Sequence, residues 1–280
     1  MNSREAQKDG AIKPRRMQFD TDNINMAQFA VKNNSLISTF FYALSAMFPD
    51  GERFFIHSVR NYQDNIKDPV LLADIRGFIG QEAHHGRCHE ELNDAIERLG
   101  IPMSMVSNNM KSRIEMLKSR FGHPRQLALT VAMEHFTASL AEFVLENPDV
   151  LEDTPETFRQ MLLWHSVEEI EHKSVAFDVF RQQVDDEWMR RRVMVVAMIS
   201  LFSRIAIFQV RMLWKTKHLP SISEWRTAWR FFWGKDGILK ANMAGLRKFF
   251  RRGFHPNDID QSELIHDWEK RYPEVAANEM

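Results

Sequence analysis

Hydrophobic residues recur along most of this chain at intervals of three and four, which places them on one face of an α-helix. Alternating runs of β-branched residues, which would predict strands, are too short to indicate a sheet. Glycine and proline number only 11 and 10 in 280 residues, and they cluster between the periodic stretches. The sequence therefore predicts an all-α fold.

Helix start and stop signals divide the chain further. Pro49-Asp50-Gly51 predicts the end of one helix over 24–48 and the start of another over 51–66. Asp68-Pro69 combines a capping side chain with a proline at the first helical position, and it predicts a helix to about residue 100. Further helices are expected over about 123–147, 155–184, 187–217, 221–233, 236–252 and 261–271.

These elements suggest three segments. We expect a flexible tail over 1–23, a four-helix bundle over 24–185, and a helical C-terminal region over 186–280. The first 17 residues are polar and basic, so no secretory signal is expected and the cytoplasm is the predicted location. The single cysteine, Cys88, excludes an internal disulfide and any cysteine-rich zinc or iron–sulfur site.

Two predicted helices carry the same pair of metal-binding residue types. Glu82 precedes His85 by three positions, and Glu169 precedes His172 by three. This spacing puts a carboxylate and an imidazole on one helical face, where both can bind one metal ion. A third such pair, Glu263 and His266, is assigned to chance because it lies near the C-terminus, outside the bundle.

The position of each motif within its helical hairpin strengthens the metal hypothesis. A dinuclear site in a four-helix bundle needs one more Glu on the helix that precedes each motif. Residues equally far from the loop of an antiparallel hairpin lie at the same level, which matches Glu52 with Glu82 and Glu134 with Glu169. Glu134 also follows an apolar stretch, where an unpaired carboxylate would be costly.

The position of a side chain on its helical face also indicates which other histidines, and whether one further Glu, can bind metal. His165 lies two turns before His172 on the same stripe and is predicted to be a ligand. His89 continues the stripe of the second helix and is predicted to support the site or the core. His84 and His135 point about 100° away from the ligand stripes and are left out. Glu142 is a possible substitute ligand or supporting carboxylate.

Residues about 48–180 resemble the bacterial family described as predicted metal-dependent hydrolases. The similarity rests on the segments 48–55, 78–85, 133–138 and 164–178, and the C-terminal part that ends at 253–256 also resembles this family. The ligand order resembles that of ferritin-like di-iron proteins, and the additional His165 resembles the spacing in di-iron arylamine N-oxygenases. These resemblances imply a metal set of Glu52, Glu82, His85, Glu134, His165, Glu169 and His172.

Two kinds of chemistry fit such a site. Carboxylates and imidazoles suit iron or manganese, and zinc remains open. We favour two iron ions in an oxygenase or oxidase that uses O₂ on a hydrophobic or aromatic small molecule, with electrons from an unidentified donor. The alternatives are hydrolysis by a metal-activated water and a non-catalytic role in metal binding.

The near-neutral net charge of −1 conceals an uneven distribution. Residues 1–187 carry 20 basic and 29 acidic residues, whereas 188–252 carry 15 basic residues and two acidic ones. The basic segment also contains Trp225, Trp229 and Trp233, a combination suited to the headgroups of anionic lipids. We therefore expect peripheral contact with the inner face of the cytoplasmic membrane. The alternative is that the helix over about 187–217 packs on the bundle as a fifth helix, with its basic stripe in water. A nucleic-acid partner is not expected, because no nucleic-acid module is recognisable.

Overall fold

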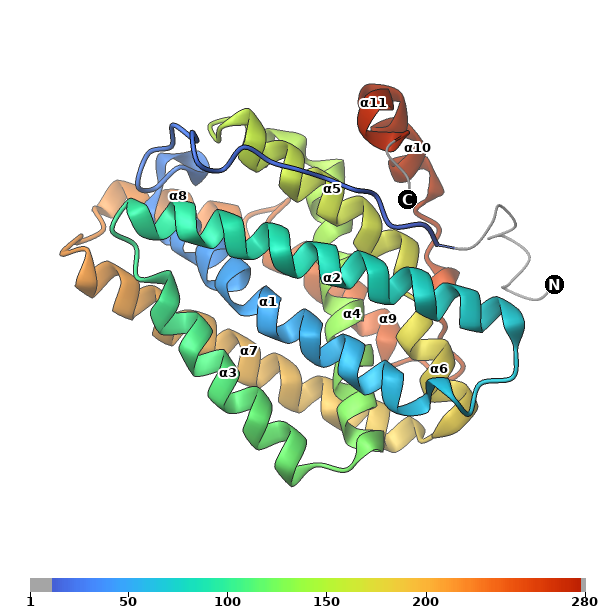
Figure 1. The fold of residues 1–280 in the computed structure, drawn as a ribbon. Helices are drawn as coiled ribbons and strands as arrows, with labels where there is room; N and C mark the ends of the chain where they lie inside the picture. Colours follow the sequence, from blue (N-terminus) through green and yellow to red (C-terminus); the bar gives the residue numbers. More distant parts are fainter. Residues whose placement is uncertain (1–11, 278–280) are drawn as a thin grey trace.

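The computed structural model describes residues 12–277, and within them the chain is helical and contains no β-strand. The all-α prediction is therefore confirmed. Figure 1 shows the helices gathered around α1, α2, α4 and α5, with α3 and α7 along one side and the later helices at the periphery. The main helices are α1 (Ser35–Gln63), α2 (Pro69–Arg98), α3 (Met103–Arg120), α4 (His123–Glu146), α5 (Glu156–His172), α6 (Val175–Gln183), α7 (Glu187–Lys215), α8 (Ile222–Trp233), α9 (Ile238–Phe249), α10 (Ser262–Arg271) and α11 (Pro273–Ala276).

Pro49 does not end a helix, which corrects the two helices expected over 24–48 and 51–66. A single helix, α1, runs through it from Ser35 to Gln63, with Asn34 as its N-terminal cap. Proline has no N–H, so it cannot donate to the carbonyl four residues earlier, which is that of Ser45. The side chain of Asn93 on α2 donates to that carbonyl at 3.0 Å instead. A neighbouring helix therefore satisfies the acceptor that the proline leaves free.

One other predicted helix differs from the structure, and one observed helix was not predicted. The helix expected over 155–184 is interrupted at Lys173 and Ser174, so that α5 ends at His172 and α6 begins at Val175. An additional helix, α3, occupies residues that were not assigned to any element. It buries only Met103, Val106 and Ile114, so its sequence carries a weak apolar pattern.

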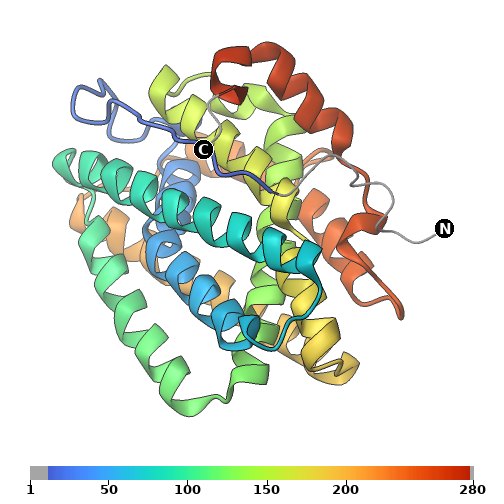
Figure 2. The same cartoon turned by 45° about the vertical axis from the view of Figure 1, so that its right-hand side comes forward.

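The segment expected to be a flexible tail is packed against the bundle where the structure describes it. Residues 12–23 run across α2 and α5, as Figures 1 and 2 show, and Met17 and Phe19 are buried. A side chain at Gly77 or Gly80 of α2 would collide with Ile12 or Pro14, so these glycines make room for the segment. Residues 1–11 of the predicted tail lie outside the described residues.

Candidate metal centre

The structure brings all seven sequence-predicted residues into one buried cluster. Four helices contribute: α1, α2, α4 and α5. None of the seven residues is more than 5% exposed. The members are Glu52 on α1, Glu82 and His85 on α2, Glu134 on α4, and His165, Glu169 and His172 on α5.

One half of the cluster is organised around His172. Its Nε2 atom lies 3.2 Å from Oε1 of Glu82 and 3.3 Å from Oε2 of Glu134. Oε2 of Glu169 is 3.7 Å from the same nitrogen. Three carboxylates from three helices thus converge on one imidazole, and the ligand atoms of Glu82, Glu169 and His172 lie close enough together to hold a metal ion.

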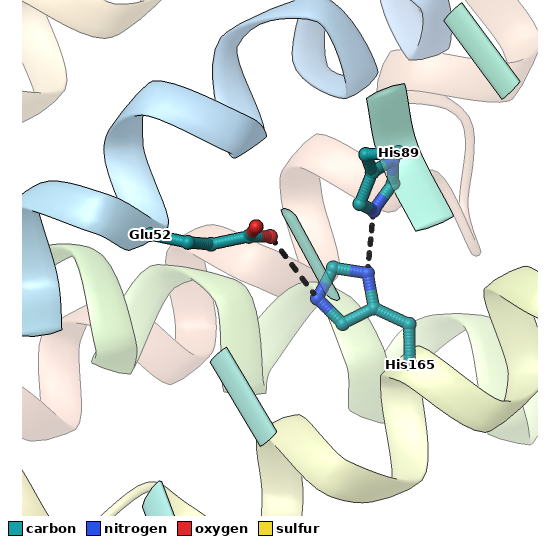
Figure 3. A group of neighbouring side chains, drawn as sticks. All are labelled: Glu52, His89 and His165. Atoms are coloured by element: carbon teal, nitrogen blue, oxygen red, sulfur yellow. Dashed lines mark hydrogen bonds and ion pairs between the residues drawn. The ribbon is translucent and has the colours of Figure 1, made fainter. Parts of the chain in front are cut away.

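The other half lies toward the start of α5. Nε2 of His165 is 2.8 Å from Oε1 of Glu169 and 3.9 Å from Oε1 of Glu52. Figure 3 shows the His165 ring between the Glu52 carboxylate and His89. Nδ1 of His85 lies 3.6 Å from the same Glu169 oxygen. Glu169 therefore directs Oε1 to this half and Oε2 to His172, which makes it a candidate bridge between two metal positions.

The hydrogen bonding of these side chains fits a metal ion better than a protein-only core. Among the described residues, neither carboxylate oxygen of Glu52, Glu82 or Glu134 has a hydrogen-bond partner, although all are buried. Nδ1 of His85 and Nε2 of His172 also have none. Buried polar atoms without partners are costly, and these converge on one volume. Gly86 adds space, because a Cβ there would lie only 3.1 Å from Oε2 of Glu52.

Two of the histidines are oriented by polar side chains behind them. Nε2 of His85 lies 3.0 Å from Oε2 of Glu168, whose Oε1 accepts from Arg15 at 3.3 Å. Nδ1 of His172 lies 2.9 Å from Oε1 of Gln81. Hydrogen bonds of this kind fix the ring orientation and tautomer of metal-binding histidines.

The third histidine, His165, is held by a longer chain of hydrogen bonds. Its Nδ1 lies 2.7 Å from Nε2 of His89, and Nδ1 of His89 lies 2.9 Å from the Ser45 hydroxyl. That hydroxyl donates to Oδ1 of Asn93 at 2.7 Å, so it accepts from His89. His89 must then accept from Nδ1 of His165. In a neutral His165, Nε2 then carries the lone pair and faces Glu52 and Glu169, as a metal ligand requires.

Burial dominates the electrostatics of the cluster. It raises the pKa of Glu52 well above the usual range, and the charges of Glu82 and Glu169 raise it further. Burial also raises the pKa of Glu82 and Glu134. Burial acts the same way on Glu169, but the interactions with the nearby His165 and His172 imidazoles outweigh it and hold its pKa well below normal. The raised pKa values favour the protonated form of Glu52, Glu82 and Glu134, so a bound cation would compete with protons for these carboxyl groups.

One protein family matches the part of the chain that contains all of these helices. The family described as "predicted metal-dependent hydrolase" matches residues 13–260, which include every helix of the candidate centre. The chain belongs to this family. No curated protein and no solved structure matches the chain significantly.

In this member of the predicted metal-dependent hydrolase family, an apolar cavity reaches the cluster of candidate metal ligands. The volume open to the centre of a water-sized sphere is about 50 Å³. His165 and Glu169 of the cluster line this cavity, and His89 and Ser45 also contribute to the lining. The remaining walls are mainly aliphatic and aromatic, and include Phe41, Leu44, Phe48, Leu92, Leu140, Ala141, Val144, Phe158 and Leu162.

His84, His135 and Glu142 do not belong to the cluster of candidate ligands in this family member. His135 is buried but is 3.1 Å from the Gly245 carbonyl, and His84 is half-buried on α2. Glu142 is half-buried and belongs to none of the groups with metal-ligand geometry in the described part of the chain. Glu134 is also outside these groups, but it lies 3.3 Å from Nε2 of His172, inside the cluster. His89 contacts His165, as a supporting residue would, and it also forms a group with metal-ligand geometry together with Glu52 and His165.

The sequence analysis missed three supporting residues, Arg15, Gln81 and Glu168. Gln81 directly precedes Glu82, and Glu168 directly precedes Glu169. This position next to a motif glutamate is the sequence feature that indicates their supporting role. Arg15 gave no signal, because its contact with Glu168 joins positions 153 residues apart.

Proposed function

We propose that this protein is a dinuclear iron oxygenase or oxidase that uses O₂ to oxidise a hydrophobic or aromatic small molecule. The observation that carries the proposal is the apolar cavity that His165 and Glu169 line. O₂ and an apolar substrate can both enter such a space, and the surrounding side chains would exclude bulk water from the site.

Charge balance supports two divalent ions rather than one. The cluster contains four carboxylates, Glu52, Glu82, Glu134 and Glu169, and three imidazoles. Four negative charges would neutralise two divalent cations, with the histidines as neutral ligands. The mixture of carboxylate and imidazole on four helices also matches the di-iron bundle pattern. Manganese and zinc accept the same ligand types, so metal analysis distinguishes among them.

The residues would divide the work as follows. Glu82 and Glu169 would lie between the two ions, and Glu134 with His172 and Glu52 with His85 and His165 would hold one ion each. The bound irons would supply the reductive activation of O₂. Transfer of one oxygen atom to a substrate, with the other released as water, needs two electrons and two protons. An external reductant would therefore have to serve as electron donor.

The second candidate is a metal-dependent hydrolase, which the family description favours. Two cations in the same cluster would lower the pKa of a bound water and hold the oxygen of a substrate carbonyl or phosphoryl group. The largely apolar lining of the cavity is less suited to this chemistry, because it offers few groups to bind a polar leaving group.

The two candidates are separated by loading the metal-free protein anaerobically with Fe²⁺ and then adding O₂. The oxygenase proposal expects rapid O₂ consumption in the wild-type protein and in Glu142→Ala, which changes a half-buried Glu of the same helix outside the cluster. It expects none in Glu134→Ala. Absence of O₂ consumption, together with ester hydrolysis by a zinc- or manganese-loaded protein, would instead establish the hydrolase.

A further inference from the structure

The outer face of α7 is an exposed apolar strip. Val196, Ile199 and Val210 are 66%, 64% and 67% exposed, values unusual for large aliphatic side chains on a packed helix. Between positions 195 and 210, a length of about 22 Å, the exposed side chains carry no charge. The strip consists of Val195, Val196, Ile199, Ser203, Ala206, Ile207 and Val210.

The opposite face of α7 is occupied by the protein itself. Met194, Leu201 and Phe208 are buried against the bundle. Arg204, the one charge near the middle of the helix, is half-buried and donates to Oδ1 of Asn109 on α3 at 2.8 Å. α7 is long and apolar enough to cross a membrane, and only 28% of its most apolar 18-residue stretch is buried inside the protein. Because one side packs on the bundle, its apolar strip is available to a surface rather than to a full span.

Tryptophan and basic side chains accompany the strip. Trp188 and Trp214, near the two ends of α7, are both 73% exposed, and Arg192, Arg211 and Lys215 are exposed near them. The next helix, α8, exposes Trp225, Trp229 and Trp233 together with Arg226 and Arg230. Tryptophan favours the membrane–water boundary, and arginine and lysine are attracted to anionic headgroups.

From these features we propose that α7 and α8 form a docking surface for an anionic lipid bilayer. The α7 strip would enter the headgroup and acyl boundary, while the flanking cations contact lipid phosphates. A second copy of the chain fits less well. Antiparallel pairing of two α7 helices would place Arg192 of one copy near Arg211 and Lys215 of the other, and like charges would repel. The basic excess of residues 188–252, 15 against two, favours an anionic partner.

The docking surface lies close to the apolar cavity. Phe41 lines the cavity, and its ring centroid is 6.3 Å from that of Phe231 on α8. Phe40 and Phe232 form a second ring contact between α1 and α8, at 5.0 Å. A membrane-dissolved apolar molecule would thus meet the protein near the cavity. The docking proposal does not depend on which reaction the metal centre performs.

Flotation with lipid vesicles tests the docking surface. The full-length protein is mixed with phosphatidylcholine vesicles, with or without phosphatidylglycerol, at low and high salt. We expect it to float with the anionic vesicles at low salt and to be released by high salt. Val196→Glu and Val210→Glu should reduce the bound fraction about tenfold, because a charge replaces apolar surface in contact with lipid. Val70→Glu on α2 is the matched control, since Val70 is 67% exposed like Val210.

Several outcomes would overturn the proposal. One is failure of the wild-type protein to float with anionic vesicles at low salt. Another is equal flotation of the α7 variants and the Val70 control. A third is a dimer in light scattering that Val196→Glu and Val210→Glu convert to monomer, since a second copy would then cover the strip. Metal content, measured on each variant, should remain at the wild-type level and separates docking from the fate of the metal centre.

Discussion

The rings of His165 and His89 are joined by a hydrogen bond, with Nδ1 of His165 2.7 Å from Nε2 of His89. His165 thereby presents Nε2 to the carboxylates of Glu52 and Glu169. Burial, together with the charge of His165, keeps the pKa of His89 well below normal, which suits a neutral ring that accepts this hydrogen bond. We therefore assign His89 a positioning role through His165, although its ring also lies within 4.8 Å of ligand atoms of Glu52 and His165.

Replacement of His89 should weaken metal binding without removing a ligand. His89→Phe keeps an aromatic ring but leaves Nδ1 of His165 without an acceptor, and the metal affinity should fall about 10- to 100-fold. His89→Gln, which retains an acceptor, should lose less. Competition with a coloured chelator measures both. His135→Phe is the control, because His135 is also buried but bonds to Gly245. An affinity loss as large in His135→Phe would contradict a specific role for His89.

Arg15 should contribute to stability as well as to the metal site. Its guanidinium is almost fully buried and contacts Glu168 at 3.3 Å and Glu171 at 2.6 Å. Arg15→Met leaves the buried Glu168 carboxylate without its charged partner, so unfolding free energy should fall by about 3 kcal/mol. Urea denaturation measures the change. Lys118→Met, which removes a more exposed pair with Glu115, should cost less than about 1 kcal/mol. Equal losses would argue against the Arg15 contacts.

Metal binding should strengthen as pH rises from about 6 to 8. Burial raises the pKa of Glu52, Glu82 and Glu134, so protons occupy these carboxyl groups in the metal-free protein and compete with the cation. The pKa of His172, lowered by burial but raised more by Glu134 and Glu169, is about 9, which adds a further proton to displace. Calorimetry in buffers of different ionisation enthalpy should therefore show proton release on binding. Affinity independent of pH would contradict this assignment.

The apolar cavity can be filled without touching a proposed ligand. Ala141→Leu adds three carbon atoms to the wall of a space of about 50 Å³. Iron content should stay at the wild-type level, whereas O₂ consumption driven by an apolar substrate should fall strongly because access to His165 and Glu169 is blocked. Helical content by circular dichroism checks that the variant folds. Unchanged substrate-driven O₂ consumption would show that substrates reach the cluster by another path.

Much of the candidate site followed from the sequence, because helical geometry converts sequence spacing into spatial position. The three-residue interval placed Glu82 beside His85, and equal distances from a hairpin loop placed Glu52 at the level of Glu82. These inferences need only the regular rise of a helix and an antiparallel connection. Whether the seven residues bind metal is a separate prediction that still requires experiment.

Features that depend on contacts between distant segments could not be predicted in this way. Pro49 predicted a helix end, because nothing close to it in the sequence indicates that the side chain of Asn93 donates a hydrogen bond to the Ser45 carbonyl. The segment around Arg15 looked like a tail, because its order depends on Glu168 and on the space at Gly77 and Gly80. The exposed face of α7 likewise required knowledge of which side packs on the bundle.

The central claim is that seven side chains from four helices bind two metal ions. The most direct measurement is anomalous X-ray diffraction at the iron edge from crystals of protein loaded anaerobically with Fe²⁺. Our account predicts two iron peaks, both contacted by Glu82 and Glu169. Glu134 and His172 would also contact one peak, and Glu52, His85 and His165 the other. A single peak, no peak, or iron bound away from these residues would contradict it.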